Sequence, residues 1–161
     1  MVEPIEPTNN DDDPQMANLL LIVVGAHLRA EVADRPLAYN LRRSVVQWLK
    51  TRHANLNILA APIVCSDLWY VNQQSLQKHP TISVGGPGVN ALSAYYSQKL
   101  TPVLVRDNQV AIQLDPEYID LRVCLWGMNH QLTVEALRLF TDKYLEEYLR
   151  AVVTQVEPQE G

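Results

Sequence analysis

Residues 81–90 read TISVGGPGVN, and this stretch indicates the type of fold. Four residues of strand character, 81–84, run into a turn with three glycines, and apolar residues at helical spacing follow from Val89. A strand that passes through a glycine turn into a helix is the unit from which α/β sheets are built. We therefore expect a strand at 81–84 and a helix at 89–100.

Two other apolar runs also end in glycine. Residues 18–24 read NLLLIVV before Gly25, and residues 121–126 read LRVCLW before Gly127. Runs this short are typical of strands that are buried on both faces. A further run at 58–65 contains Pro62, which cannot donate a ladder hydrogen bond, so we expect an edge strand or a break there.

Helical periodicity separates these strands. After a polar loop at 26–35, Asp34 is a candidate N-cap and Pro36 suits the first turn of a helix that ends near residue 51. Asn72 is a candidate cap for a short helix within 67–78. Thr133 is expected to cap one long final helix that reaches residue 153.

Strands and helices alternate, apart from one hairpin. Residues 102–106 and 110–114 have β-alternation around Asp107 and Asn108, which suit a tight hairpin turn. The pattern predicts an α/β fold: a three-layer, Rossmann-like open sheet that is mostly parallel, with an antiparallel hairpin at one edge. We expect a single domain at 18–153.

Charge is unevenly distributed along the chain, whose 161 residues carry a formal net charge of −5. Residues 1–17 hold five acids and no Lys or Arg, and 154–161 hold two more acids, so we expect disordered tails. Residues 18–153 hold all 13 basic residues and 11 acids, a balance that suits a small anionic ligand but argues against nucleic acid. No apolar run reaches the length of a membrane span, so we expect no membrane partner. Two cysteines do not make a disulfide framework, so we expect a cytoplasmic protein.

Five of the six glycines come just after predicted strands. In open α/β sheets, ligands bind outside the carboxyl ends of the strands, where the strand order reverses. Gly85, Gly86 and Gly88 would let the backbone approach a ligand, and the amides around 88–90 would be free donors for a phosphate or carboxylate. Asn90 would cap the helix, contact the ligand or tie the loop to a neighbouring strand. A purely structural turn is the alternative.

Other chemistry-bearing residues follow the first strand. Arg29 or Arg35 can hold an anion, and His27 or Glu31 can move protons. The alternative is a solvated loop. His130, after the last strand, would meet His27 if those two strands were neighbours.

The second strand is followed by Asp67, a candidate acceptor for a ligand hydroxyl or a candidate base. Trp69 and Trp126, at two predicted strand ends, can stack on a planar ligand or pad the core. Cys65 and Cys124 are expected to be buried and inert.

These patterns predict a domain that binds a small, anionic, nucleotide-like ligand. If it is an enzyme, hydrolysis or glycosyl transfer fits best, with His27 and His130 as proton carriers and Asp67 as acid or base. The enzyme interpretation requires that His27, Asp67, Asn90 and His130 line one concavity. No cofactor is identified, and no HxH or HExxH motif supports a metal-dependent hydrolase built on His27, Asp67 and His130. The other alternative is a non-catalytic interaction module, or a homo-oligomer formed through the aromatic face of the final helix.

Overall fold

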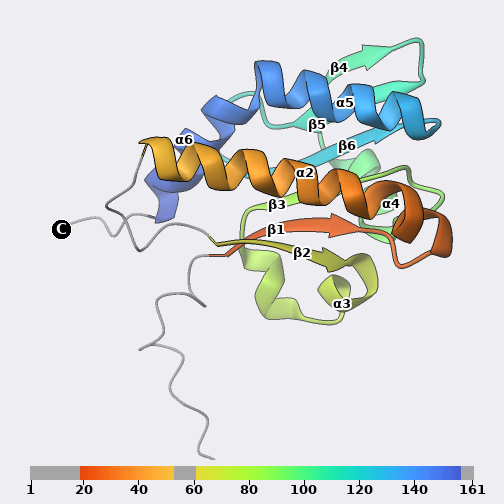
Figure 1. Ribbon diagram of the computed structural model, residues 1–161, viewed down its shortest axis with the longest axis horizontal. Coiled ribbons are helices and arrows are strands. Elements are labelled where there is room, and N and C mark those ends of the chain that lie inside the picture. The colour runs from red at the N-terminus through yellow and green to blue at the C-terminus, as the bar shows by residue number, and fades with distance from the viewer. Residues whose placement is uncertain (1–18, 53–60, 157–161) are drawn as a thin grey trace, which may run out of the picture.

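The computed structural model describes residues 19–52 and 61–156, which form an α/β fold around a six-stranded, mostly parallel sheet (Figure 1). The strand order is β2-β1-β3-β6-β5-β4. The strands are β1 (Leu19–Val24), β2 (Ala61–Ser66), β3 (Thr81–Val84), β4 (Pro102–Arg106), β5 (Val110–Leu114) and β6 (Arg122–Gly127). The first four in this order are parallel, and β5 and β4 add an antiparallel edge. The edge position predicted for the strand with Pro62 is confirmed, although residues 58–60 of that prediction lie outside the described part.

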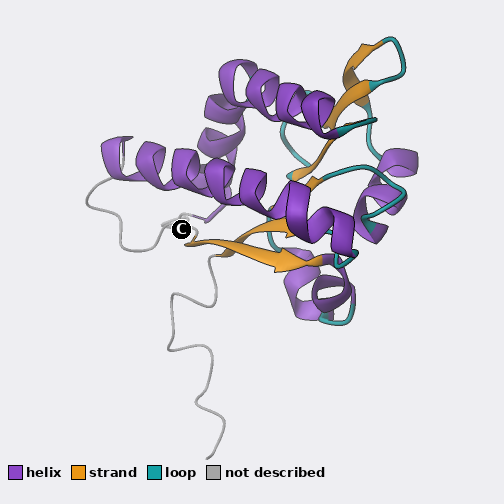
Figure 2. Cartoon of the chain, turned by 45° about the vertical axis from the view of Figure 1, so that its right-hand side comes forward, coloured by secondary structure: helices purple, strands orange, loops and turns teal. Residues whose placement is uncertain are grey.

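Helices cover both faces of the sheet (Figure 2). They are α2 (Leu28–Arg52), α3 (Asp67–Val71), the 3₁₀ helix η2 (Gln74–Lys78), α4 (Ala91–Lys99), α5 (His130–Lys143) and α6 (Leu145–Val156). The core clusters place α2, α5 and α6 on one face, and α3, η2 and α4 on the other. Among the described helices, none has the length and apolar character needed to cross a membrane.

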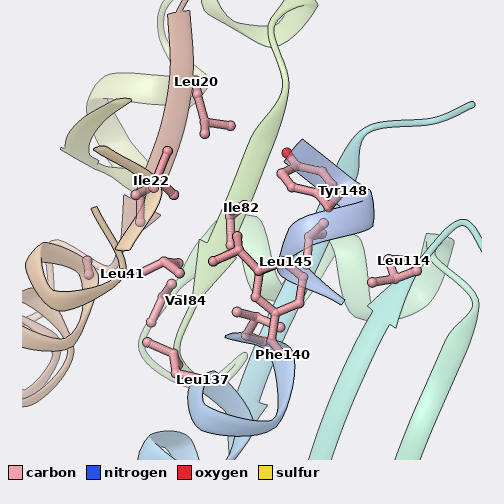
Figure 3. Close-up of a cluster of buried hydrophobic side chains, with 14 of the residues drawn as sticks. Leu20, Ile22, Leu41, Ile82, Val84, Leu114, Leu137, Phe140, Leu145 and Tyr148 are labelled. Carbon is pink, nitrogen blue, oxygen red and sulfur yellow. The ribbon is translucent and has the colours of Figure 1, made fainter. Parts of the chain in front are cut away.

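Side chains of β1 alternate between the two faces, as the period of two in a strand requires. Leu20 and Ile22 join the cluster under α2, α5 and α6, whereas Leu21 and Val23 join the cluster under α4. Figure 3 shows the larger cluster, to which β1 contributes Leu20 and Ile22, β3 contributes Ile82 and Val84, and α5 contributes Leu137 and Phe140. Burial of each such side chain contributes about 1.5–3 kcal/mol. The strand is therefore apolar throughout because both of its faces are covered.

The hairpin between β4 and β5 follows the sequence prediction. Asp107 and Asn108 have φ values of 54° and 56°, which a tight hairpin turn requires at its two central residues. Asp and Asn accept this left-handed backbone more readily than other non-glycine residues.

The start of α2 is predicted wrongly. The helix begins at Leu28, so Asp34 is not its cap and Pro36 is not in its first turn. The described residues buried on its inner face recur at helical spacing: Ala30, Asp34, Ala38, Leu41 and Val45. Asp34 thus occupies one position of an otherwise apolar stripe.

The predicted final helix is in fact two helices. Asn129, not Thr133, caps α5, because the Asn129 side chain accepts a hydrogen bond from the Leu132 N–H. The helix is interrupted at Tyr144, and α6 continues to Val156, three residues past the predicted end of the domain. The predicted tail at 1–17 lies outside the described residues, as does 157–161.

The short helix α3 also has a different cap from the one predicted. The Ser66 hydroxyl accepts a hydrogen bond from the Trp69 N–H at its start, and Asn72 caps its carboxyl end instead.

Candidate functional site

A hollow of about 450 Å³ opens at the carboxyl edge of the sheet. Its walls come from the first turns of α2, the turn after β3 and the start of α5. The chain leaves β3 towards α4 on one face of the sheet and leaves β6 towards α5 on the other. Neighbouring strands whose connections diverge in this way leave a crevice between them, which is where α/β sheets bind ligands. The volume lies within the range of small-molecule sites.

Asp34 is the buried ionisable group of this hollow. Its side chain lines the hollow, and the residue is only 5% exposed. Among the described residues, no hydrogen bond or ion pair engages its carboxylate. Burial raises the pKa of Asp34 from 3.8 to about 6, and the nearby charge of His130 opposes this rise. Its oxygen atoms do not belong to the fully buried polar atoms that lack a partner in the described part of the chain, so the carboxylate faces the open space of the hollow.

Gly85 makes room for this carboxylate. Gly85 follows β3 with a φ of 108°, a backbone conformation that favours glycine, and a Cβ at this position would overlap Asp34 Oδ2. Any side chain at this position would have to displace the Asp34 carboxylate. Gly85, predicted from the sequence to bind a ligand, instead accommodates Asp34 and does not itself line the hollow.

Hydrogen-bond donors surround the mouth of the hollow. Arg29 in the first turn of α2 and His130 at the start of α5 are exposed side chains that line it. Within the described part of the chain, no hydrogen bond uses the backbone N–H groups of His130 and Gln131. These amides lie at the positive end of the helix dipole. Asp34 therefore faces a rim suited to an anionic group.

The amides expected to be free at the start of α4 are already occupied. The N–H groups of Val89 and Asn90 both donate to the Gly86 carbonyl. Ala91 N–H donates to Asp67 at 2.8 Å, and the next two amides donate to Asn90 Oδ1. The expectation of free donors around 88–90 is wrong for Val89 and Asn90, and an anion would find them at the start of α5 instead.

Asn90 performs two of the three roles considered from the sequence. Its Oδ1 caps α4, and its Nδ2 donates to the carbonyls of Val23 in β1 and Val84 in β3. With two acceptor and two donor interactions, the amide has no hydrogen-bonding capacity left. At 1% exposure, Asn90 ties two strands to a helix rather than facing the hollow.

Asp67 is likewise engaged by the protein itself. Its Oδ1 accepts from the N–H groups of Ala26 and Leu68, and its Oδ2 accepts from Ala91. The carboxylate therefore joins the loop after β1 to the starts of α3 and α4. Asp67 is 4% exposed and does not line the hollow.

His27 and Glu31 are placed outside the hollow. His27 Nδ1 accepts a hydrogen bond from the Arg29 N–H, so this exposed side chain caps the start of α2. Glu31 pairs with Arg35 at 3.1 Å along the same helix. Since β3 lies between β1 and β6, the strands that precede His27 and His130 are not neighbours, contrary to the condition for their contact.

The two tryptophans also lie away from the hollow. Trp69 is 47% exposed on α3, and Trp126 packs with the cluster beneath α4 while its Nε1–H donates to Gln113. A second hollow, of about 350 Å³, lies on this face between α3 and α4 and is lined by Tyr70, Tyr95 and Tyr96.

Of the eleven site residues predicted from the sequence, the structure brings four to the hollow: Arg29, Gly86, Gly88 and His130. The seven that do not line it are His27, Asp67, Glu31, Trp69, Gly85, Asn90 and Trp126. The four residues named as the criterion for an enzyme do not share this concavity, because His130 alone among them lines it.

Other chemistry considered from the sequence finds little structural basis. Cys65 and Cys124 are buried, and burial raises the pKa of their thiols to about 11 and about 12, so neither is a ready nucleophile. The described residues contain no cluster of three or more His, Cys, Asp or Glu side chains that could hold a metal ion. The aromatic residues Phe140 and Tyr148 lie in the protein's own core rather than on a surface for a second copy.

Comparisons of the chain with protein-family models, curated proteins and solved structures find no match. The candidate site therefore rests on its geometry. The group that sequence reasoning misses is Asp34, because its position before Pro36 suggests a helix cap. The sequence does carry a signal for it, which is a single acid at the i, i+4 spacing of Ala30 and Ala38.

Proposed function

We propose that this chain is a small-molecule binding protein of Rossmann-like type that holds an anionic, nucleotide-like ligand in the hollow beside Asp34. The observation that carries the proposal is the Asp34 carboxylate, which is 5% exposed, lines the hollow and has no partner among the described residues. A carboxylate in this state is stabilised when a ligand supplies the missing hydrogen-bond donor.

The rest of the hollow supports an anionic ligand. Arg29 provides positive charge at the rim, and His130 and the amide groups at the start of α5 provide hydrogen-bond donors there. Gly86 and Gly88 in the turn after β3 leave the backbone accessible on the opposite wall. A ligand with an anionic group at one end and a hydroxyl at the other matches this arrangement, as a ribose phosphate does.

The enzymatic alternative, hydrolysis or glycosyl transfer, loses the residues that the sequence assigned to it, because only His130 among His27, Asp67 and His130 lines the hollow. Asp34, whose pKa burial raises to about 6, is the group in the hollow that can exchange a proton near neutral pH, whereas Asp67 is held by three backbone amides. We also propose a cytoplasmic location, because two unpaired, buried thiols suit a reducing compartment.

The proposal is tested by isothermal titration calorimetry with mononucleotides, ribose 5-phosphate and inorganic phosphate. We expect binding by the native protein and a loss of affinity of about 10-fold in Arg29→Ala, the value of one charged contact. Arg43→Ala is the matched control, because Arg43 is an exposed arginine of the same helix that does not line the hollow. Absence of binding by all three probes, or equal losses in both variants, would contradict the proposal.

A further inference from the structure

The charged groups of the hollow are arranged by depth. Asp34 is 5% exposed and lines the hollow, whereas Arg29 and His130 are exposed at the rim. A ligand held by its anionic group at the rim therefore directs its other end towards the Asp34 carboxylate. Asp34 can therefore discriminate between ligands by the chemical group at their inner end.

We propose that the ligand is a phosphorylated polyol or sugar whose hydroxyl group hydrogen-bonds to Asp34, and that Asp34 determines specificity for this hydroxyl. This inference rests on the proposed function, and it names the part of the ligand that the proposed function leaves open. It also accounts for the acid in the buried stripe of α2, where its neighbours Ala30 and Ala38 are apolar.

A structural role for Asp34 and a ligand ammonium group both fit the contacts less well than a hydroxyl. A structural role would give the carboxylate hydrogen bonds within the fold, as Asp67 has with three backbone amides, but Asp34 has none among the described residues. A ligand ammonium group would be repelled by Arg29 and by the positive ends of α2 and α5.

A hydroxyl is also compatible with both protonation states of the carboxyl group. Burial raises the pKa of Asp34 to about 6, so both states are accessible near neutral pH. A hydroxyl donates to the carboxylate and accepts from the carboxylic acid, whereas an ammonium group can only donate.

The test compares glycerol 3-phosphate with propyl phosphate, which has the same carbon chain without hydroxyls, and with inorganic phosphate. We expect the native protein to bind glycerol 3-phosphate about 10- to 100-fold more tightly than propyl phosphate, the range for a hydrogen bond to a charged group. In Asp34→Ala this preference should disappear, while inorganic phosphate should bind at least as well as before.

Glu31→Gln is the matched control, because Glu31 is an acid of the same helix that does not line the hollow. It should keep the preference for glycerol 3-phosphate. Circular dichroism and urea unfolding verify that each variant is folded. The inference is overturned if propyl phosphate binds as tightly as glycerol 3-phosphate, if the preference survives in Asp34→Ala, or if 2-aminoethyl phosphate binds more tightly than glycerol 3-phosphate. If no phosphate compound binds at all, the proposed function itself fails.

Discussion

Replacing Asp34 by Asn should stabilise the protein above neutral pH and lose much of this advantage in acid. The carboxyl group lines the hollow without a hydrogen-bonding partner among the described residues, and burial raises its pKa from 3.8 to about 6. Asn has nearly the same shape and no charge, so the variant removes the ionisation while preserving the packing against Gly85.

The magnitude follows from the linkage between protonation and folding. Because the folded protein binds this proton more tightly than the unfolded chain, native stability falls as the pH rises from 3.8 to about 6. The rise in pKa lowers the free energy of unfolding by at most about 3 kcal/mol above this pH window and does not change it below the window. The hollow is open to water, so screening reduces the loss and we expect about 2 kcal/mol.

Urea unfolding of the native protein and Asp34→Asn at pH 4 and pH 8 measures this effect. The difference in free energy of unfolding between the two proteins should shift in favour of Asn by about 2 kcal/mol between the two pH values. Glu31→Gln is the control for loss of an acid from the same helix, since Glu31 is paired with Arg35 on the surface. A difference that does not change with pH would show that the Asp34 carboxylate is already solvated or paired, and the reasoning would be refuted.

Other substitutions test the framework around the hollow. Asn90→Ala should lower the free energy of unfolding, measured in urea, by about 3 kcal/mol, because it removes the cap of α4 and two buried hydrogen bonds to β1 and β3. Asn72→Ala, which removes an exposed cap, should lower it by under about 1 kcal/mol. Equal losses in the two variants would contradict this prediction. Gly85→Ala should lower the free energy of unfolding by about 1–3 kcal/mol, because residue 85 has a φ of 108° and the added Cβ would contact Asp34 Oδ2. The same substitution in an Asp34→Ala background should cost less, and the difference measures the contribution of that contact. Equal costs in both backgrounds would show that the contact contributes nothing. Cys65 and Cys124 should resist an aromatic disulfide reagent at pH 8 in the folded protein, because burial raises their pKa values to about 11 and about 12, and labelling as fast as in urea would contradict this.

Several elements could be predicted because their local signals and their burial agree. The run at 18–24 is apolar on both faces, and β1 is indeed covered on both faces. Asp107 and Asn108 indicate a hairpin turn because few residues accept positive φ, and both have it. Pro62 indicates an edge strand, and β2 is at the edge.

The start of α2 could not be predicted because its local signals are misleading. Asp34 and Pro36 together suggest a cap and a first turn, yet both are inside the helix. Leu28 and Val32 are exposed apolar residues, which obscures the amphipathic pattern of the first turns. The interruption of the final helix at Tyr144 has no glycine or proline to announce it.

The sequence predicts a site at the edge of the sheet where the hollow lies, but with partly different residues. The glycines after the strands indicate the edge, because turns at strand ends need them. Which side chains remain free at that edge depends on tertiary hydrogen bonds: Asn90 and Asp67 are fully engaged, whereas Asp34 is not. Such partners come from segments distant in the chain, so spacing alone does not reveal them.

The proposed site is tested most directly by mapping the backbone amide signals of the isotope-labelled protein by nuclear magnetic resonance during titration with glycerol 3-phosphate. We expect the largest shifts at Gly86, Gly88 and His130, which line the hollow, and small shifts at Tyr95 and Tyr96 beside the second hollow between α3 and α4. The same titration of Asp34→Ala should need a higher ligand concentration. Shifts concentrated at Tyr95 and Tyr96, or none at saturating ligand, would contradict a binding site at the carboxyl edge of the sheet.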